Sequence, residues 1–284
     1  MPSRVGVTVA RRVWTRLFGA RSWVERNGDF RTRERYGLVV RSPYAYGMLR
    51  AADMAKYFGK TRVTVVEFGV AGGAGLLNMI EIARLVEAET GVGLRIVGFD
   101  TGRGLPPVEG YKDHPELWRG GDFAPGDRDE LVRKLAGRAE IIWGDINDTI
   151  GPFTGALEDA APLGFVSIDL DLYTATKAAL RCLTGRPEQY NPAISMCFDD
   201  VRSFFANEWA GELAAIAEFN DEHEARKMGR DRSLPGRRPV KADGWYETMY
   251  VCHVLDHPAR QTPRKRPALT VEAHHEFVSA NFLY

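Results

Sequence analysis

The sequence predicts an α/β fold built on a parallel, doubly wound sheet. Five short apolar segments rich in β-branched residues alternate with segments of helical period. Each of the five ends on an acidic residue or within two residues of one, and the first runs directly into a glycine-rich turn. Because strands that alternate with helices need crossover connections, we expect them to run parallel, with helices on both faces of the sheet.

The five strands are expected, in chain order, at 63–67, 94–100, 139–143, 165–169 and 193–198. Helices are expected at 44–58, 76–86, 129–135 and 174–183, by their apolar period. A late antiparallel strand is expected within 244–256, where Met249, Val251 and His253 recur at every second position. The composition of residues 101–107 predicts a loop.

At 284 residues the chain fits one large domain with elaborations. We expect a basic N-terminal arm at 1–42, with a short amphipathic helix around 8–18. The main domain is expected at 43–284, with insertions near 108–127 and 222–243. The first 41 residues hold ten arginines and three acids. We expect this arm to pack on a second subunit of a homodimer or higher homo-oligomer.

Charge and cysteine usage exclude several classes of function. The chain has 38 basic and 38 acidic residues, few aromatics interleave its arginine runs, and no recognised nucleic-acid motif accompanies them, so neither nucleic acid nor membrane is an expected partner. No apolar span reaches 18 residues. The cysteines Cys182, Cys197 and Cys252 are far apart, which predicts no disulfide framework or zinc site and favours a reduced, cytoplasmic setting.

The glycine turn after the first strand discriminates between nucleotide cofactors. Its strand–turn–helix order places backbone N–H groups where a cofactor can approach. Dinucleotide enzymes use G-x-G-x-x-G there to hold a pyrophosphate. Here Ala71 lies two residues after Gly69, and Glu67 would repel a phosphate but attract an ammonium or sulfonium group. The pattern favours S-adenosyl-L-methionine over NAD; the alternative is an ordinary glycine turn.

Further motifs follow in a fixed order over about residues 44–220. They are Glu67-Phe68-Gly69-Val70-Ala71-Gly72-Gly73, Gly98-Phe99-Asp100, Gly121-Asp122-Phe123, Gly144-Asp145-Ile146, Asp169-Leu170-Asp171-Leu172-Tyr173, Asp199-Asp200 and Ala217-Glu218-Phe219. Together they resemble the class I S-adenosylmethionine-dependent methyltransferases, and among them the macrocin O-methyltransferase type. Two departures, at Thr101-Gly102-Arg103 and at Asn191-Pro192-Ala193, indicate a divergent branch. The resemblance implies a Rossmann-like, mostly parallel seven-stranded sheet with one late antiparallel strand.

The resemblance also implies a cofactor site. The methionine part would lie over Gly69, Ala71, Gly72 and Gly73, with Glu67 fixing its polar end. Asp100 would accept hydrogen bonds from both ribose hydroxyls, a task that needs a two-oxygen acceptor at a strand end. Asp145 would bind the adenine amino group, with Ile146 against the ring. Thr101, Gly144 and Asp169 complete the implied set.

Four aspartates form a second constellation: Asp169, Asp171, Asp199 and Asp200. Two strands deliver them to one edge, where clustered carboxylates raise one another's pKa unless a cation neutralises them. Such oxygen ligands suit Mg²⁺. In the resembling families the ion grips two neighbouring substrate oxygens and lowers the pKa of the attacked hydroxyl. We expect Asp169, Asp199 and Asp200 as ligands, with Asp169 also at the reacting centre.

Asp171 is the expected general base, or a fourth ligand. Strand alternation would keep it on the same side as Asp169 if the strand continued. The alternative is that Asp199 and Asp200 cap the following helix while Asp171 lies on the surface. His114, Trp118, Tyr173, Trp209 and Trp245 are possible substrate-facing groups.

The sequence thus predicts an S-adenosylmethionine-dependent, Mg²⁺-assisted O-methyltransferase of a small hydroxylated molecule, either a natural product or a sugar. Methyl transfer needs proximity, alignment and a deprotonated nucleophile, and no covalent enzyme intermediate. One alternative is a cofactor-binding domain without transfer activity that serves a partner. Another is an NAD-linked dehydrogenase, which Ala71 and Glu67 disfavour. The acceptor, and whether its reacting atom is oxygen or nitrogen, stay open.

Overall fold

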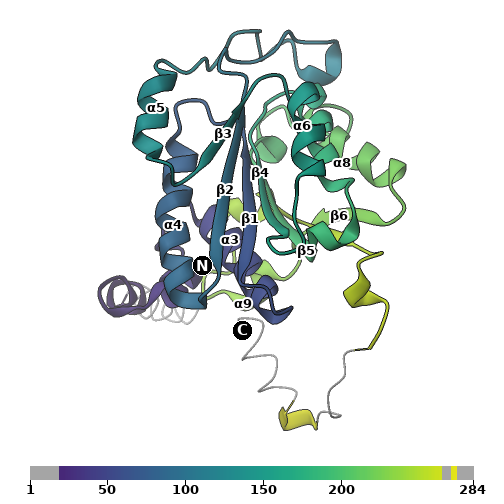
Figure 1. The fold of residues 1–284 in the computed structure, drawn as a ribbon. Helices are drawn as coiled ribbons and strands as arrows, with labels where there is room; N and C mark the ends of the chain where they lie inside the picture. The colour runs from purple at the N-terminus through teal and green to yellow at the C-terminus, as the bar shows by residue number, and fades with distance from the viewer. Residues whose placement is uncertain (1–18, 264–269, 274–284) are drawn as a thin grey trace, which may run out of the picture.

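The structure is a computed structural model that describes residues 19–263 and 270–273 (Figure 1). The helix expected around residues 8–18 lies outside the described residues. Seven strands form one sheet in the order β3-β2-β1-β4-β5-β7-β6. Their bounds are β1 Arg62–Phe68, β2 Gly93–Asp100, β3 Glu140–Trp143, β4 Leu163–Ile168, β5 Tyr190–Phe198, β6 Arg226–Arg230 and β7 Met249–Val254. β7 runs antiparallel to both β5 and β6, and the other pairs are parallel. The predicted fold class is confirmed.

Helices cover both faces of the sheet. They are α2 Phe30–Arg35, α3 Ser42–Tyr57, α4 Ala74–Thr90, α5 Arg128–Leu135, α6 Ile146–Gly155, α7 Tyr173–Ala179, α8 Gly211–Glu222 and α9 Leu234–Arg237. Figure 1 shows α4 and α5 on one side of the sheet and α6 and α8 on the other. The apolar core is divided accordingly, with α3 and α4 packed on one face and α6 and α8 on the other.

The central strand β1 lies between two covered faces, so it carries apolar side chains on both. From Val63 to Phe68 every residue is buried, including the acid Glu67. Continuous burial of this kind is typical of parallel sheets with helices on both sides. The glycine turn that follows β1 is therefore anchored at the centre of the molecule.

Several details differ from the sequence-based expectation. The structure adds elements that the apolar pattern does not predict, among them the helices α2, α6, α8 and α9 and the strand β6. The helix expected at 174–183 is α7, which passes into a 3₁₀ helix at Leu180–Leu183.

The described part of the basic arm packs on its own chain. Arg31 forms ion pairs with Asp53 of α3 and Glu89 of α4, and Arg238 pairs with Glu34 of α2. The expected contact with a second subunit stays a prediction. All three cysteines are buried, and among the described helices none is long and apolar enough to cross a bilayer.

Candidate active site

Four backbone hydrogen bonds join the carboxyl ends of the five parallel strands β3, β2, β1, β4 and β5. Each residue just after a strand donates its backbone N–H to the neighbouring strand tip. These bonds run from Gly144 N to Asp100 O (3.0 Å), Gly69 N to Phe99 O (2.9 Å), Asp169 N to Phe68 O (3.0 Å) and Asp199 N to Ile168 O (3.1 Å). The acids that end the strands are therefore held in a row along one edge of the sheet, where open α/β sheets bind ligands.

A cavity of about 380 Å³ lies along this edge. It is lined by eleven of the fourteen residues that the sequence places in the site: Gly69, Ala71, Asp100, Thr101, Gly144, Asp145, Ile146, Asp169, Asp171, Asp199 and Asp200. Six of these are aspartates, and among the described residues that line the cavity there is no lysine, arginine or histidine. The cavity is thus suited to a ligand with positive charge.

The glycine turn approaches the second half of the site closely. Gly69 has a φ of 87°, and a Cβ added to it would overlap the carbonyl oxygen of Asp169. A side chain at this position would therefore push the turn after β1 away from the residue that follows β4. Ala71 also adopts a left-handed conformation, with a φ of 43°.

Asp100 holds the glycine turn in place. Its Oδ2 accepts hydrogen bonds from the backbone N–H groups of Val70 (3.0 Å) and Ala71 (2.8 Å), and its Oδ1 accepts one from Gly102 (2.6 Å). The N–H groups that a pyrophosphate would use are thus already bonded, which disfavours a dinucleotide. Because a carboxylate offers about four lone-pair sites, Asp100 still has capacity for ribose hydroxyls.

Glu67 lies below the cavity and does not line it. Its Oε1 accepts a hydrogen bond from the Tyr44 hydroxyl (2.8 Å), which in turn accepts one from Ser167 (3.0 Å). Burial raises the pKa of Glu67 to about 8, so the carboxyl is largely neutral at pH 7. The repulsion of phosphate expected from this residue is therefore weak. The feature that disfavours a dinucleotide is instead the set of N–H groups in the turn that are already hydrogen-bonded.

Two further predicted residues, Gly72 and Gly73, lie in the turn but outside the cavity lining. Gly73, with a φ of 84°, precedes the first residue of α4. No signal in the sequence separates these two glycines from Gly69, since all three belong to one run.

The turn after β3 forms the other end of the cavity. Asp145 is the N-cap of α6, and its side chain accepts a hydrogen bond from the backbone N–H of Asn147 (2.8 Å). Ile146, the first residue of α6, packs against the core and also lines the cavity. One residue thus offers a carboxylate oxygen and the next an apolar surface, as the adenine assignment requires.

Three of the aspartates that follow β4 and β5 have a raised pKa. Burial, together with the charges of Asp199 and Asp200, raises the pKa of Asp169 to about 7. Burial and the same neighbours raise the pKa of Asp171 to about 7, and burial and Asp199 raise that of Asp200 to about 6. These acids therefore change charge over the pH range in which a general base operates.

Glu212, at the start of α8, lies behind this cluster and was not expected in the site. It is buried, and its Oε2 accepts a hydrogen bond from the backbone N–H of Asp200 (2.9 Å). Burial raises its pKa well above the ordinary value. The Oδ2 of Asp200 and the Oε1 of Glu212 are both buried without a hydrogen-bond partner.

Asp171 reaches the cavity by a different route from the one expected. β4 ends at Ile168, so strand alternation does not extend to Asp171. Instead its backbone is left-handed, with a φ of 61°. Asp199 is the N-cap of the 3₁₀ helix Asp200–Arg202, but its side chain makes no capping bond. Asp199 is exposed but does not cap the helix through its side chain, and Asp171 is half-buried, so the capping alternative does not fit Asp199 and the surface alternative does not fit Asp171.

The metal site expected at Asp169, Asp199 and Asp200 can be tested against the side-chain positions. Within residues 19–263 and 270–273, no three or more His, Cys, Asp and Glu side chains are gathered in a way that could hold a metal ion. The donor chemistry fits Mg²⁺, and the Oδ2 of Asp200 is buried without a hydrogen-bond partner. The arrangement of the side chains does not yet form a coordination shell.

Two aromatic side chains contribute to the cavity wall. Trp118 and Phe123 both line it and pack edge to face, with ring centroids 5.8 Å apart. Their loop is fixed by Asp113, whose carboxylate accepts bonds from Glu109 and Thr174. Trp118 thus lies where the sequence analysis expected a substrate-facing group.

The other expected substrate-facing groups do not line this cavity. His114 is buried beside it, with Nδ1 2.8 Å from Glu116. Tyr173 bonds to Glu218, Trp245 packs against Tyr46, and Trp209 is exposed.

No family model matches the chain, and no curated protein matches it. Among solved structures it is similar to the calicheamicin methyltransferase CalS11, with a TM-score of 0.48 and 20% identity over 84% of this chain and 91% of that one. It is similar to the O-methyltransferase NovP, with a TM-score of 0.47 and 17% identity over 64% and 72%. An O-methyltransferase from Bacillus cereus in complex with SAH has a TM-score of 0.40 and 13% identity over 76% and 81%. None of these similarities is high enough to assign a function to this chain. The proposed function therefore rests on the residues of the chain itself. Membership of the macrocin type stays a prediction.

Proposed function

We propose that this chain is an S-adenosylmethionine-dependent methyltransferase that acts on a hydroxyl group of a small molecule. The observation that carries the proposal is the charge of the cavity: six aspartates and no basic side chain among its described lining residues. S-adenosylmethionine carries a sulfonium and an ammonium group against one carboxylate, so its net charge complements the cavity. NAD carries a pyrophosphate, for which the turn has few N–H groups left.

The residues along the strand tips suit the parts of this cofactor in order. Asp100 would accept from the ribose hydroxyls while it holds the turn at Val70 and Ala71. Asp145 would accept from the adenine amino group, and Ile146 would contact the ring. The methionine end would lie near Gly69 and Asp169, where the two halves of the site meet.

Bound S-adenosylmethionine would supply an electrophilic methyl group. The chain would contribute alignment and a base. Asp171 lines the cavity, and its pKa of about 7 suits removal of a proton from an acceptor hydroxyl near neutral pH. Asp169 lies nearby and would hold charge opposite the donor. Trp118 and Phe123 would exclude water from the aromatic side of the cavity.

We include Mg²⁺ in the proposal as a ligand of Asp169, Asp199 and Asp200, supported by their oxygen donors and mutual charge. When bound, it would lower the pKa of an acceptor hydroxyl. Because the side chains do not form a coordination shell, no step of the transfer is derived through the metal.

We also propose a cytoplasmic homo-oligomer that uses the basic arm as a subunit contact. The contact would involve the arm of residues 1–42. Light scattering would compare the full chain with one that lacks this arm. A shortened chain with the same mass distribution as the full chain would contradict this part of the proposal.

Calorimetry tests the proposed function directly. We expect S-adenosylmethionine and S-adenosylhomocysteine to bind, and NAD not to bind. Asp145→Ser keeps an N-cap oxygen for α6 but removes the carboxylate, so we expect about tenfold weaker cofactor binding from the loss of one charge-assisted hydrogen bond. Asp148→Ser, on an exposed residue of the same helix outside the cavity, is the matched control. Binding of NAD without binding of S-adenosylmethionine would refute the proposal.

A further inference from the structure

The aspartate-lined cavity poses a problem for one group of the proposed cofactor. The methionine end of S-adenosylmethionine carries a carboxylate, and the cavity offers it no basic side chain among its described lining residues. Six aspartates nearby would repel that carboxylate, and the N–H groups of Val70 and Ala71 are bonded to Asp100. A cation near the Gly69 end of the cavity is therefore needed.

Arg41 does not line the cavity, but Tyr44 links it to the residue beneath that end. Its guanidinium carbon is 5.4 Å from the ring centroid of Tyr44, and the hydroxyl of Tyr44 bonds to Glu67 directly below the turn. Burial raises the pKa of Glu67, and the positive charge of Arg41 offsets part of that rise. The charge of Arg41 therefore acts on the last acid of β1, two residues before Gly69.

Arg41 has no other partner to hold it. Among the described residues, its guanidinium makes no ion pair within 4.0 Å and no side-chain hydrogen bond. Other arginines in this part of the fold are engaged: Arg31 with Asp53 and Glu89, Arg50 with Asp231, and Arg238 with Glu34. Arg41 is also exposed, so its long side chain can turn toward the cavity.

The backbone at Arg41 resembles that of the cavity residues. Six non-glycine residues of the described chain have a positive φ, and three of them, Ala71, Phe123 and Asp171, line the cavity. Arg41 is another, with a φ of 50° at the N-cap of α3. Its carbonyl accepts hydrogen bonds from the N–H groups of Tyr44 and Ala45. A left-handed conformation strains a residue that has a side chain, and such strain concentrates at functional sites.

We propose that Arg41 binds the carboxylate of the cofactor's methionine end. The inference rests on the proposed function and assigns it a residue that lies outside both the glycine turn and the strand tips. A guanidinium suits this task because its planar fork can hold both oxygens of a carboxylate. The aspartates then face the ammonium and sulfonium groups, while Arg41 faces the one negative group.

Decarboxylated S-adenosylmethionine provides the test, because it keeps the sulfonium and ammonium groups and lacks only the carboxylate. We expect the parent to bind S-adenosylmethionine at least tenfold tighter than the decarboxylated form. In Arg41→Gln, affinity for S-adenosylmethionine should fall by about 10- to 100-fold, the loss of one charge-assisted pair, while affinity for the decarboxylated form changes less than threefold. Arg41→Lys should retain part of the preference.

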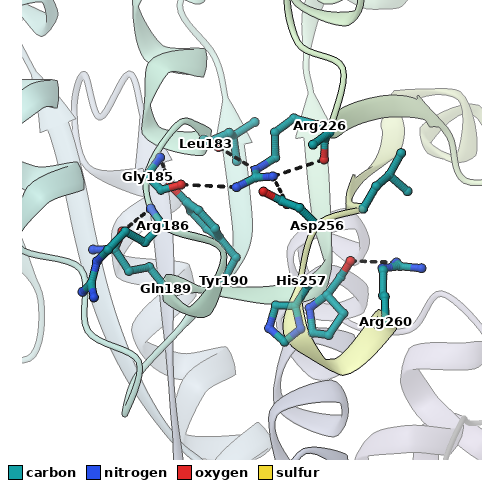
Figure 2. A network of polar contacts seen from close by, with 12 residues as sticks. Leu183, Gly185, Arg186, Gln189, Tyr190, Arg226, Asp256, His257 and Arg260 are labelled. Carbon is teal, nitrogen blue, oxygen red and sulfur yellow. Dashed lines mark hydrogen bonds and ion pairs between the residues drawn. The ribbon is translucent and has the colours of Figure 1, made fainter. Parts of the chain in front are cut away.

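Arg186→Gln is the control for the change in net charge. Arg186 is exposed near the start of β5, at the opposite edge of the sheet, and should leave both affinities unchanged (Figure 2). If Arg41→Gln keeps the parent's preference, weakens both ligands equally or tightens S-adenosylmethionine, the inference is wrong while the proposed function stands. If the parent binds neither ligand, both fall. Thermal unfolding of Arg41→Gln should match the parent within a few degrees, since the side chain is exposed.

Discussion

The two edges of the sheet differ in how fully their buried polar groups are hydrogen-bonded. At the amino edge, where β5 and β6 begin, Figure 2 shows the guanidinium of Arg226 surrounded by acceptors. It donates to the carbonyls of Leu183, Gly185 and Ala225, each at 3.2 Å, and pairs with Asp256.

Gln189 and Tyr190 complete that network. Gln189 donates to the carbonyls of Thr154 (3.1 Å) and Leu157 (2.6 Å) and accepts from the N–H of Arg186 (2.7 Å). Tyr190 donates to the carbonyl of Cys182. No atom of this network is among the described buried side-chain atoms that lack a partner.

At the carboxyl edge the balance is reversed. Glu67, Asp200 and Glu212 each have a buried oxygen without a partner, and acids with raised pKa values lie side by side. Buried polar groups are normally satisfied, so incomplete ones need an explanation. The difference indicates that the amino edge stabilises the fold, while the carboxyl edge gives up stability to hold a charged ligand.

The largest loss of stability is expected when the hydrogen-bond network at the amino edge is disrupted. Arg226→Met removes a buried cation and leaves the carbonyls of Leu183 and Gly185 without this donor, so we expect the free energy of unfolding to fall by about 3 kcal/mol. Arg181→Met, on an exposed residue near the same edge, is the control. Urea unfolding measures both. Cofactor affinity of folded Arg226→Met should equal that of the parent, and a parallel loss of affinity would show that the two edges are not independent.

The stability of the carboxyl edge should depend on pH, which distinguishes it from the amino edge. Because the pKa of Asp169 is raised from 3.8 to about 7 on folding, the folded state holds its proton more tightly than the unfolded state. The stability this contributes is present below pH 4 and is lost as pH rises from about 4 to about 7. Asp169→Asn should therefore stabilise the ligand-free protein at pH 8, on the order of 2 kcal/mol, relative to its effect at pH 4.

The control for that measurement is Asp221→Asn, on an exposed residue of α8. Its effect on unfolding should be small and nearly constant with pH. If Asp169→Asn behaves in the same way as this control, the carboxyl edge does not carry the electrostatic cost assigned to it.

The smallest expected effect concerns the metal. In the parent, Mg²⁺ at ten times its Kd should raise unfolding free energy by about 1.4 kcal/mol, seen as a higher Tm. Asp199→Ala and Asp200→Ala should abolish this response and leave affinity for S-adenosylhomocysteine nearly intact. Variants that respond to Mg²⁺ as the parent does would show that the ion, if it binds, lies elsewhere.

The sequence predicted the strand tips well because their signal is local. An apolar β-branched run that ends in an acid or a glycine, as at Val63–Gly69, gives both a strand and its end within a few residues. The elements it missed lack such a signal. α6 contains Pro152, α8 has a weak apolar face rich in alanine, and β6 is a short, basic edge strand.

The contacts beneath the site could not be predicted in the same way. Tyr44 meets Ser167 across 123 residues of sequence, and only the packing of α3 on the sheet brings them together. The position of Asp171 depends on a single left-handed residue, for which the sequence carries no glycine or asparagine as a marker. The sequence therefore located the acids, while their environment and pKa values required the fold.

Because residue 69 is a glycine, the two segments that meet there can hardly move relative to each other. Since the backbone there lies against the main chain of residue 169, the segment that would cradle the methyl donor and the segment that would orient its target form one stiff unit. Any adaptation to a new target would then have to arise in the surrounding loops, above all at 108–127, because the distance between the two reacting partners is built into the sheet.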